Sequence, residues 1–144
     1  MPPIDPTLNN SLERFLTAQA PVYDTVLSEL RAGRKTTHWM WFIFPQLRGL
    51  GRSTTADYFG LKDIAEARSY LAHETLGARL RQCSGILLTT GDKTAYQVFG
   101  SPDDLKLCSC MTLFSSLAET NSPFDEVLRK YFPNQPPAPA ASGG

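Results

Sequence analysis

The sequence HWMWFIFPQ, at residues 38–46, constrains the fold most, because its residues 39–44 are apolar without interruption. A run that is apolar on every side must lie largely inside the protein. Its period does not distinguish a buried helix from a buried strand, since the run is too short. Pro45 closes the run in either case. The run is therefore compatible with two fold classes. One is an all-α fold, and the alternative is an α+β fold with a minor sheet from residues 39–44.

The segments on both sides of this run have the apolar period of amphipathic helices. Residues 12–30 keep a 3.6-residue stripe that Pro21 kinks or restarts, and Gly33 suits a helix C-cap. Residues 76–87 and 107–118 each place apolar side chains at spacings of 4, 3 and 4. The chain is therefore predicted to be all-α.

Helix starts are marked by capping residues and by acids that favour the helix dipole. Five such starts are read from the sequence: Thr54-x-x-Asp57, Asp63-x-x-Glu66, Thr75, Ser101-Pro102-Asp103-Asp104 and Ser122-Pro123-x-Asp125-Glu126. Together with the stripes they predict a compact fold of about six to seven short helices.

The chain is expected to form one domain. Its 144 residues fit a single core. We predict an N-terminal arm at 1–10, a globular all-α domain at 11–132 and a disordered tail at 133–144. The tail is rich in Pro, Ala and Gly, a composition that buries too little apolar surface to fold.

Charge and cysteine content narrow the function classes. Lys and Arg number 14, as do Asp and Glu, so we expect no general binding to nucleic acid, which calls for a positive excess. No apolar run reaches the roughly 20 residues of a membrane span, and no signal peptide is read at the N-terminus, so we expect no membrane association and a cytoplasmic location. Three cysteines without framework spacing predict reduced thiols, with Cys108 and Cys110 unsuited to a metal site. No cofactor motif is found, and none is expected.

The densest group of chemistry-bearing residues lies at the start of the apolar run. Arg34 and Lys35 could hold a phosphate or carboxylate, Trp39 and Trp41 could stack on a base or sugar, and His38 could move a proton. The alternative is a solvated helix end whose cations complement the helix dipole, followed by a core segment.

A second candidate lies at residues 49–53, Gly-Leu-Gly-Arg-Ser. There the Gly51 backbone, Arg52 and Ser53 could hold an anion just before a helix. A plain turn is the alternative reading, since a third glycine and a phosphate-loop lysine are missing. Asp104 is the candidate partner of His38 in proton transfer, with a dipole-stabilising role as its alternative.

Several motifs together resemble one known family. They are Phe15-x-x-Ala18-Gln19, GRKT at 33–36 followed by HWMWFIFPQ, Gly49-Leu50-Gly51-x-Ser53, YLAH at 70–73, Leu76-Gly77-x-Arg79-Leu80, FGSPDDLKL at 99–107 and MTLF at 111–114. Over roughly residues 11–132 the chain is similar to the domain-of-unknown-function family 1810. The resemblance implies a small bacterial all-α protein of a family with no established activity.

The chain departs from that family at two places. Cys108 and Cys110 stand where the family has a variable residue and a serine, which argues against an essential thiol. The Pro-rich tail replaces a further short helix. Some members are labelled calpastatin-like, and the composition of this chain argues against that disordered inhibitor.

A second, partial likeness concerns residues 87–92 and 101–104. Leu-Leu-x-Thr-Gly-Asp followed by Ser-Pro-x-Asp is similar to a segment of the N-glycosidases that act on ADP-ribose-linked and riboflavin-pathway substrates. Their W-G-x-G and E-H motifs are missing here, so the likeness implies no catalytic residue in this chain.

Two functions of different classes follow. The first is a domain that binds a small anionic ligand, nucleotide- or sugar-phosphate-like, with hydrolytic or N-glycosidase-type activity left open. The second is a non-catalytic interaction module, with a homodimer as one form, that uses exposed aromatics such as Trp39, Tyr58 or Phe59. Whether the protein is an enzyme, and its oligomeric state, stay open at this point.

Overall fold

The computed structural model describes residues 6–49 and 53–133, with side chains from residue 12 onward. The described residues form nine α-helices: α1 (Pro6–Gln19), α2 (Tyr23–Ala32), α3 (Met40–Ile43), α4 (Thr54–Phe59), α5 (Ile64–Ala72), α6 (Glu74–Leu87), α7 (Ala95–Phe99), α8 (Asp103–Leu117) and α9 (Pro123–Tyr131). The all-α prediction is confirmed. The predicted count of six to seven helices is low, because α3 and α7, of four and five residues, are too short to show a helical period.

The apolar run folds as a single helical turn. Residues 40–43 are α3, and the Phe44 N–H donates to the Met40 carbonyl at 3.1 Å. The alternative of a minor sheet at residues 39–44 is therefore wrong. Within the described residues the one β-type pairing is an isolated parallel bridge between Leu47 and Leu61.

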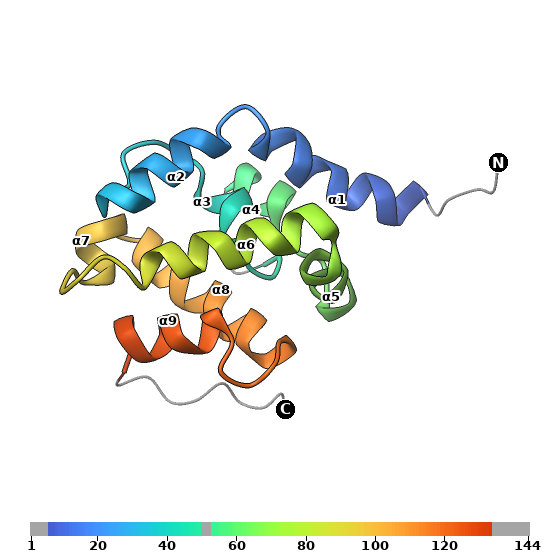
Figure 1. The fold of residues 1–144 in the computed structure, drawn as a ribbon. Coiled ribbons are helices and arrows are strands. Elements are labelled where there is room, and N and C mark those ends of the chain that lie inside the picture. The colour runs from blue at the N-terminus through green and yellow to red at the C-terminus, as the bar shows by residue number, and fades with distance from the viewer. Residues whose placement is uncertain (1–5, 50–52, 134–144) are drawn as a thin grey trace.

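Helix α6 lies at the centre of the fold, as Figure 1 shows. It contacts α2 on one side and α9 on another, and it meets α5 at their common junction. Helix α8 packs against α9, α7 and α5, while α3 contacts α1 and α4. The core therefore lies between the α1–α2 layer and the α8–α9 layer, with α6 running between them (Figure 1).

The predicted stripes face this core. Leu76, Leu80, Cys83 and Leu87 of α6 are at most 1% exposed. The α8 stripe is likewise buried at its first three members, Leu107, Met111 and Phe114. From the apolar run, Trp39, Met40, Ile43, Phe44 and Pro45 are buried, whereas Trp41 and Phe42 stay partly exposed. The run is thus largely internal, as its composition predicts.

Two predicted caps are confirmed. Gly33 ends α2 in a left-handed backbone conformation, with φ of 71°. Ser122 caps α9 by accepting from the Asp125 N–H, with Pro123 at the first helical position. The Asp63 start is also confirmed, since its carboxylate accepts from the Glu66 N–H.

Three other starts differ from the prediction. Helix α4 is capped by Ser53 and not by Thr54, because it is the Ser53 hydroxyl that accepts from the Ala56 N–H. Helix α6 begins at Glu74 and not at Thr75, and the His73 Nδ1 accepts from the Thr75 and Leu76 N–H groups. Helix α8 begins at Asp103, directly after Pro102, and the Ser101 side chain does not cap it.

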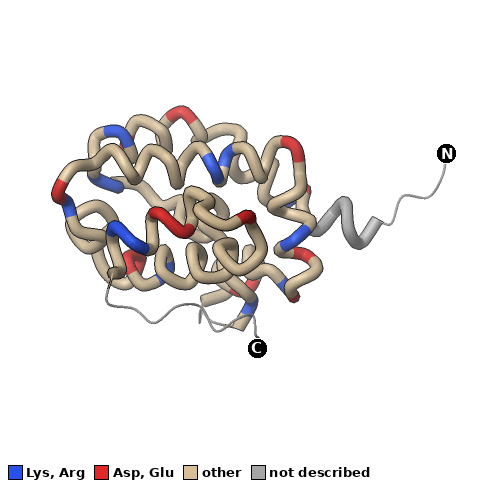
Figure 2. The backbone as a smooth tube through the Cα atoms, turned by 60° about the horizontal axis from the view of Figure 1, so that its bottom comes forward, with Lys and Arg blue, Asp and Glu red and all other residues tan. Residues whose placement is uncertain are grey.

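Charges of both signs are distributed around the described part of the chain (Figure 2). Ion pairs join elements far apart in sequence, such as Arg14 with Glu66 at 3.2 Å. Among the described helices, none is both long and apolar enough to cross a bilayer.

Candidate functional site

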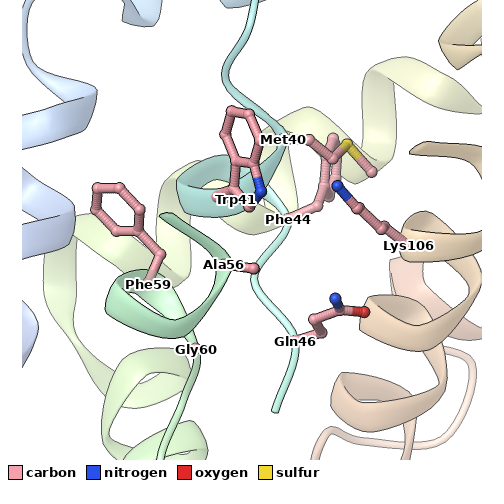
Figure 3. A pocket seen from close by; sticks show the side chains of 8 residues that line it. All are labelled: Met40, Trp41, Phe44, Gln46, Ala56, Phe59, Gly60 and Lys106. Carbon is pink, nitrogen blue, oxygen red and sulfur yellow. The ribbon is translucent and has the colours of Figure 1, made fainter. Parts of the chain in front are cut away.

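A small hollow lies between α3, α4 and α8. Its lining residues are Met40, Trp41, Phe44, Gln46, Ala56, Phe59, Gly60 and Lys106. Met40, Phe44 and Gly60 are buried and form its floor, whereas the other five are partly exposed and form its mouth. In Figure 3 the nitrogen atoms of Trp41, Lys106 and Gln46 lie around one common space, with Ala56 beside it.

The backbone around Gly60 holds one wall of the hollow in place. The Leu61 N–H donates to the Gln46 carbonyl at 3.0 Å, and the Arg48 N–H donates to the Leu61 carbonyl at 2.6 Å. The two segments approach so closely that a Cβ at position 60 would lie 2.6 Å from the Arg48 Cα. Glycine at position 60 is thus required for this close approach of the two segments.

Trp41 carries an unsatisfied hydrogen-bond donor. Its indole Nε1 is buried and has no hydrogen-bond partner, alone among the side-chain polar atoms that the structure describes. Buried polar groups are nearly always hydrogen-bonded, and an unpaired one costs about 1–3 kcal/mol. A ligand atom that accepts a hydrogen bond from this N–H would recover that cost.

A positive charge lies beside this donor. The Lys106 Nζ lies 5.0 Å from the centroid of the Trp41 ring and 3.5 Å from Asp103 Oδ1. The other carboxylate oxygen of Asp103 is paired with the Lys35 Nζ at 2.9 Å. Two ammonium groups therefore share one carboxylate, which leaves this triad with a net charge of one positive unit.

Lys35 also contacts Trp39, which belongs to a structural network around Glu29. The Lys35 side chain is 7% exposed and its Nζ lies 5.2 Å from the centroid of the Trp39 ring. The indole Nε1 of Trp39 donates to Glu29 Oε1 at 2.9 Å. Trp39 is 1% exposed, so its expected role as an exposed aromatic of an interaction module is wrong. Packing against Phe44 and Phe99 accounts for its burial.

Glu29 is the centre of that network. Its carboxylate accepts from the Thr36 N–H at 2.8 Å, the Thr37 N–H at 3.1 Å and the Thr37 hydroxyl at 2.7 Å, besides the Trp39 indole. Burial alone would raise the pKa of this carboxyl, but these donors outweigh it and lower the pKa to about 2. Glu29 thus closes the loop that leads from α2 into α3.

The two predicted proton-transfer residues, His38 and Asp104, do not contact each other through a hydrogen bond or an ion pair in the described part of the chain. His38 is exposed on the loop before α3. Asp104 lies in the first turn of α8, where its Oδ1 accepts from the Leu105 N–H at 2.9 Å. Neither of them is among the described residues that line the hollow.

The predicted anion-binding residues are dispersed. Arg34 is exposed, and Lys35 is paired with Asp103. Gly51 and Arg52 lie outside the described residues. Ser53 caps α4, whose Ala56 and Phe59 line the hollow. Of the predicted ligand-binding residues that are described, the structure brings Trp41 alone to the hollow.

Sequence reasoning missed Lys106, Gln46 and Phe59 as members of one site. Lys106 belongs to the FGSPDDLKL motif, and Gln46 ends HWMWFIFPQ. The presence of Lys106 and Gln46 in the two most distinctive motifs was the one sequence signal that could have pointed to them. Their meeting depends on the packing of α8 beside α3, which no local pattern reports.

The three cysteine thiols have raised pKa values. Cys83, Cys108 and Cys110 are free, and burial raises the pKa of each, to about 12 for Cys83. Cys83 also contacts the Tyr23 hydroxyl at 3.8 Å. Among the described residues no group of three or more His, Cys, Asp and Glu side chains is arranged to hold a metal ion.

Exposed large apolar side chains occur on several elements. Tyr58 and Ile64 lie on α4 and α5, at 56% and 42% exposed, and Tyr96 and Leu105 lie on α7 and α8, at 64% and 63%. Phe59 is partly exposed at the mouth of the hollow. The interaction module with a homodimer as one form stays a prediction.

Comparisons with known proteins support one family. The chain is similar to the crystal structure of the conserved hypothetical protein Rv1873 from Mycobacterium tuberculosis, with 51% identity and a TM-score of 0.83. The match covers 86% of this chain and 89% of that one. No curated protein matches the chain. The model of a family described as a protein of unknown function, DUF1810, matches residues 9–141. The chain therefore belongs to the DUF1810 family.

Proposed function

We propose that the protein binds a small molecule by accommodating an anionic group of that molecule in the hollow between α3, α4 and α8. The observation that carries the proposal is the buried Trp41 Nε1 without a partner, beside the ammonium group of Lys106. An indole N–H and an ammonium group both donate hydrogen bonds and accept none, so the ligand must bring acceptor atoms. A negatively charged acceptor satisfies both groups and gains the added strength of a charge-assisted hydrogen bond.

The size of the hollow limits which part of the ligand enters. Its enclosed volume is about 10 Å³, close to what one water molecule needs. Pockets that enclose a whole drug-sized ligand measure roughly 300–1,000 Å³. Only one acceptor atom of a terminal group of the ligand therefore enters fully, and the rest of that group and the body lie across the mouth against the partly exposed Trp41, Ala56 and Phe59.

The chemistry of the lining favours binding over catalysis. Lys106 is the one titratable side chain among the described residues that line the hollow. A nucleotide- or sugar-phosphate-like ligand and a hydrolytic or N-glycosidase-type activity, with His38 and Asp104 moving protons, stay proposals. So do the ligand contacts predicted for Arg34, Lys35, Trp39, Gly51, Arg52 and Ser53.

Binding can be tested with four probes: benzoate, phenyl phosphate, glucose 6-phosphate and adenosine monophosphate. We expect at least one probe to bind to the full chain, measured by titration calorimetry and by a rise in melting temperature. Trp41→Phe and Lys106→Met should each weaken that binding by at least about tenfold. Trp41→Phe keeps a ring in place and removes the N–H donor.

Lys130→Met is the matched control. The Lys130 Nζ lies 5.4 Å from the Tyr131 ring centroid, a geometry similar to that of Lys106 on Trp41, but on α9 and away from the hollow. Binding should be unchanged in this variant. The proposal fails if none of the four probes binds, or if the Lys106 and Lys130 variants lose affinity equally. Loss in Arg34→Ala with full retention in Lys106→Met would place the anion at the loop before α3 instead.

A further inference from the structure

We infer that the anionic group suited to this hollow is a carboxylate on an apolar body, and not a phosphate. This inference rests on the proposed function, because it names the ligand class for the same site. It follows from the charge, the donor set and the walls of the hollow.

The charge at the site matches a single negative unit. Lys35, Lys106 and Asp103 together carry one net positive charge, because Asp103 bridges the two ammonium groups at 2.9 and 3.5 Å. A carboxylate brings one negative charge, whereas a phosphate monoester brings nearly two at neutral pH. The second charge of a phosphate would find no further cation in this triad to neutralise it.

The donors are also those of a carboxylate site. Trp41 Nε1 offers one hydrogen bond, Lys106 offers its ammonium group, and the Gln46 side chain, which lines the same space in Figure 3, offers its amide. Proteins more often hold phosphate with planar arginine forks or with several backbone N–H groups at a helix start or in a loop. Among the described residues, no arginine lines the hollow.

Asp103 itself shows that a carboxylate fits the Lys106 ammonium group. Its longer contact is to Lys106, at 3.5 Å, and its shorter one is to Lys35, at 2.9 Å. Asp103 is therefore paired more closely with Lys35 than with Lys106, and the Lys106 ammonium group has donors left for a second carboxylate. In this arrangement Asp103 sets the charge specificity and Lys35 positions Asp103.

The walls of the hollow favour an apolar body. Met40, Phe44, Ala56 and Phe59 contribute apolar surface around the three donors. Burying apolar ligand surface against them gains about 25 cal/mol per Å². A sugar body would place hydroxyl groups against these side chains, where they lose hydrogen bonds to water.

A set of matched probes tests how the charge and the shape of the anionic group each affect the affinity. Benzoate, benzamide, benzenesulfonate and phenyl phosphate share one ring and differ in the charge and shape of the attached group. At pH 7.5 we expect benzoate to bind at least about tenfold more tightly than benzamide and phenyl phosphate, a ratio that corresponds to 1.4 kcal/mol. Benzenesulfonate, a monoanion, should bind more tightly than phenyl phosphate.

The variant Asp103→Asn provides the sharpest test, because it raises the net charge of the triad by one unit. We expect phenyl phosphate to gain affinity relative to benzoate by about tenfold in this variant. Lys35→Met should instead weaken benzoate binding, because Asp103 then pairs with Lys106 alone. Circular dichroism confirms that each variant is folded.

The outcomes distinguish the inference from the proposed function. If phenyl phosphate binds more tightly than benzoate to the unmodified protein, the inference is overturned while the proposed function stands. Equal binding of benzamide and benzoate overturns both the inference and the proposed function, because no anion is then required. If no anionic probe binds at all, the proposed function fails as well. A preference for benzoate that Asp103→Asn reduces supports the inference.

Discussion

Trp39 and Trp41 lie two residues apart in one apolar run, yet their surroundings are opposite. The N–H of Trp39 donates to the carboxylate of Glu29, and its ring is 1% exposed. The N–H of Trp41 has no partner, and its ring is partly exposed at the mouth of a hollow. The first indole stabilises the fold, and the second leaves a buried donor unpaired at a cost to the fold. Composition alone therefore does not separate a tryptophan that is hydrogen-bonded in the core from one whose donor is left unpaired.

Removing the acceptor of Trp39 should have the largest effect on stability. Glu29→Gln leaves one oxygen for four donors and places an amide N–H₂ among them, so we expect a loss of about 4 kcal/mol in the free energy of unfolding. Urea denaturation measures this loss. A loss below about 1 kcal/mol would show that water satisfies these donors as well as Glu29 does.

The Glu29 carboxylate should also make the free energy of unfolding depend on pH. Its pKa in the folded protein is about 2, below the ordinary value of 4.5, so its contribution is fully present above pH 4.5 and is lost as the pH falls toward 2. The expected loss is on the order of 3 kcal/mol. Urea titrations between pH 6 and pH 2 measure it, and Glu29→Gln should remove most of it.

Glu119 is the control for this acid dependence. Its hydrogen bonds with Arg81 also lower the pKa of that carboxyl to about 2, but the pair lies at the surface. Glu119→Gln should therefore leave most of the acid dependence in place, and more so at high salt, which screens surface pairs. If Glu119→Gln removes as much of the acid dependence as Glu29→Gln, Glu29 is not the main source of the acid dependence.

Phenylalanine at each tryptophan position compares the two indoles directly. Trp39→Phe loses a hydrogen bond to a charged acceptor and part of a packed ring, so we expect a loss of about 2–3 kcal/mol. Trp41→Phe removes a donor that has no partner, so the free energy of unfolding should stay within about 1 kcal/mol of its original value. Equal losses in the two variants, measured by urea denaturation, would contradict the comparison.

The smallest effect on stability is expected at Lys106. Its side chain is partly exposed, and its ion pair with Asp103 is the longer of that carboxylate's two, so Lys106→Met should change the free energy of unfolding by about 0.5 kcal/mol or less. Its effect on anion binding should be large in comparison. A large loss of stability with unchanged binding would make Lys106 a structural residue.

Much of the fold could be predicted because it depends on local pattern. The α6 stripe of Leu76, Leu80, Cys83 and Leu87 is buried as its spacing predicts, and Gly33 and Ser122 cap the helices that they should cap. Helix α3 could not be assigned, because four residues show no period.

The candidate site could be predicted only in part, because it depends on packing across the fold. Trp41 was recognised from its place in the apolar run. Lys106 lies on α8, and its position over the Trp41 ring follows from how α8 packs beside the apolar run. The engagement of Lys35 by Asp103 likewise joins segments that are distant in sequence. The sequence pattern therefore indicates which residues carry the right chemistry. Tertiary contacts decide which of these residues are free to contact a ligand.

The most direct test observes the two indole N–H groups together. In a ¹H–¹⁵N correlation spectrum of the full chain, Trp39 and Trp41 give one side-chain signal each, and Trp41→Phe assigns them. The protein is titrated separately with benzoate, phenyl phosphate, glucose 6-phosphate and adenosine monophosphate. We predict that at least one probe moves the Trp41 signal in a saturable way while the Trp39 signal stays in place. A Trp41 signal that none of the four probes moves, or a Trp39 signal that moves alone, would contradict the account.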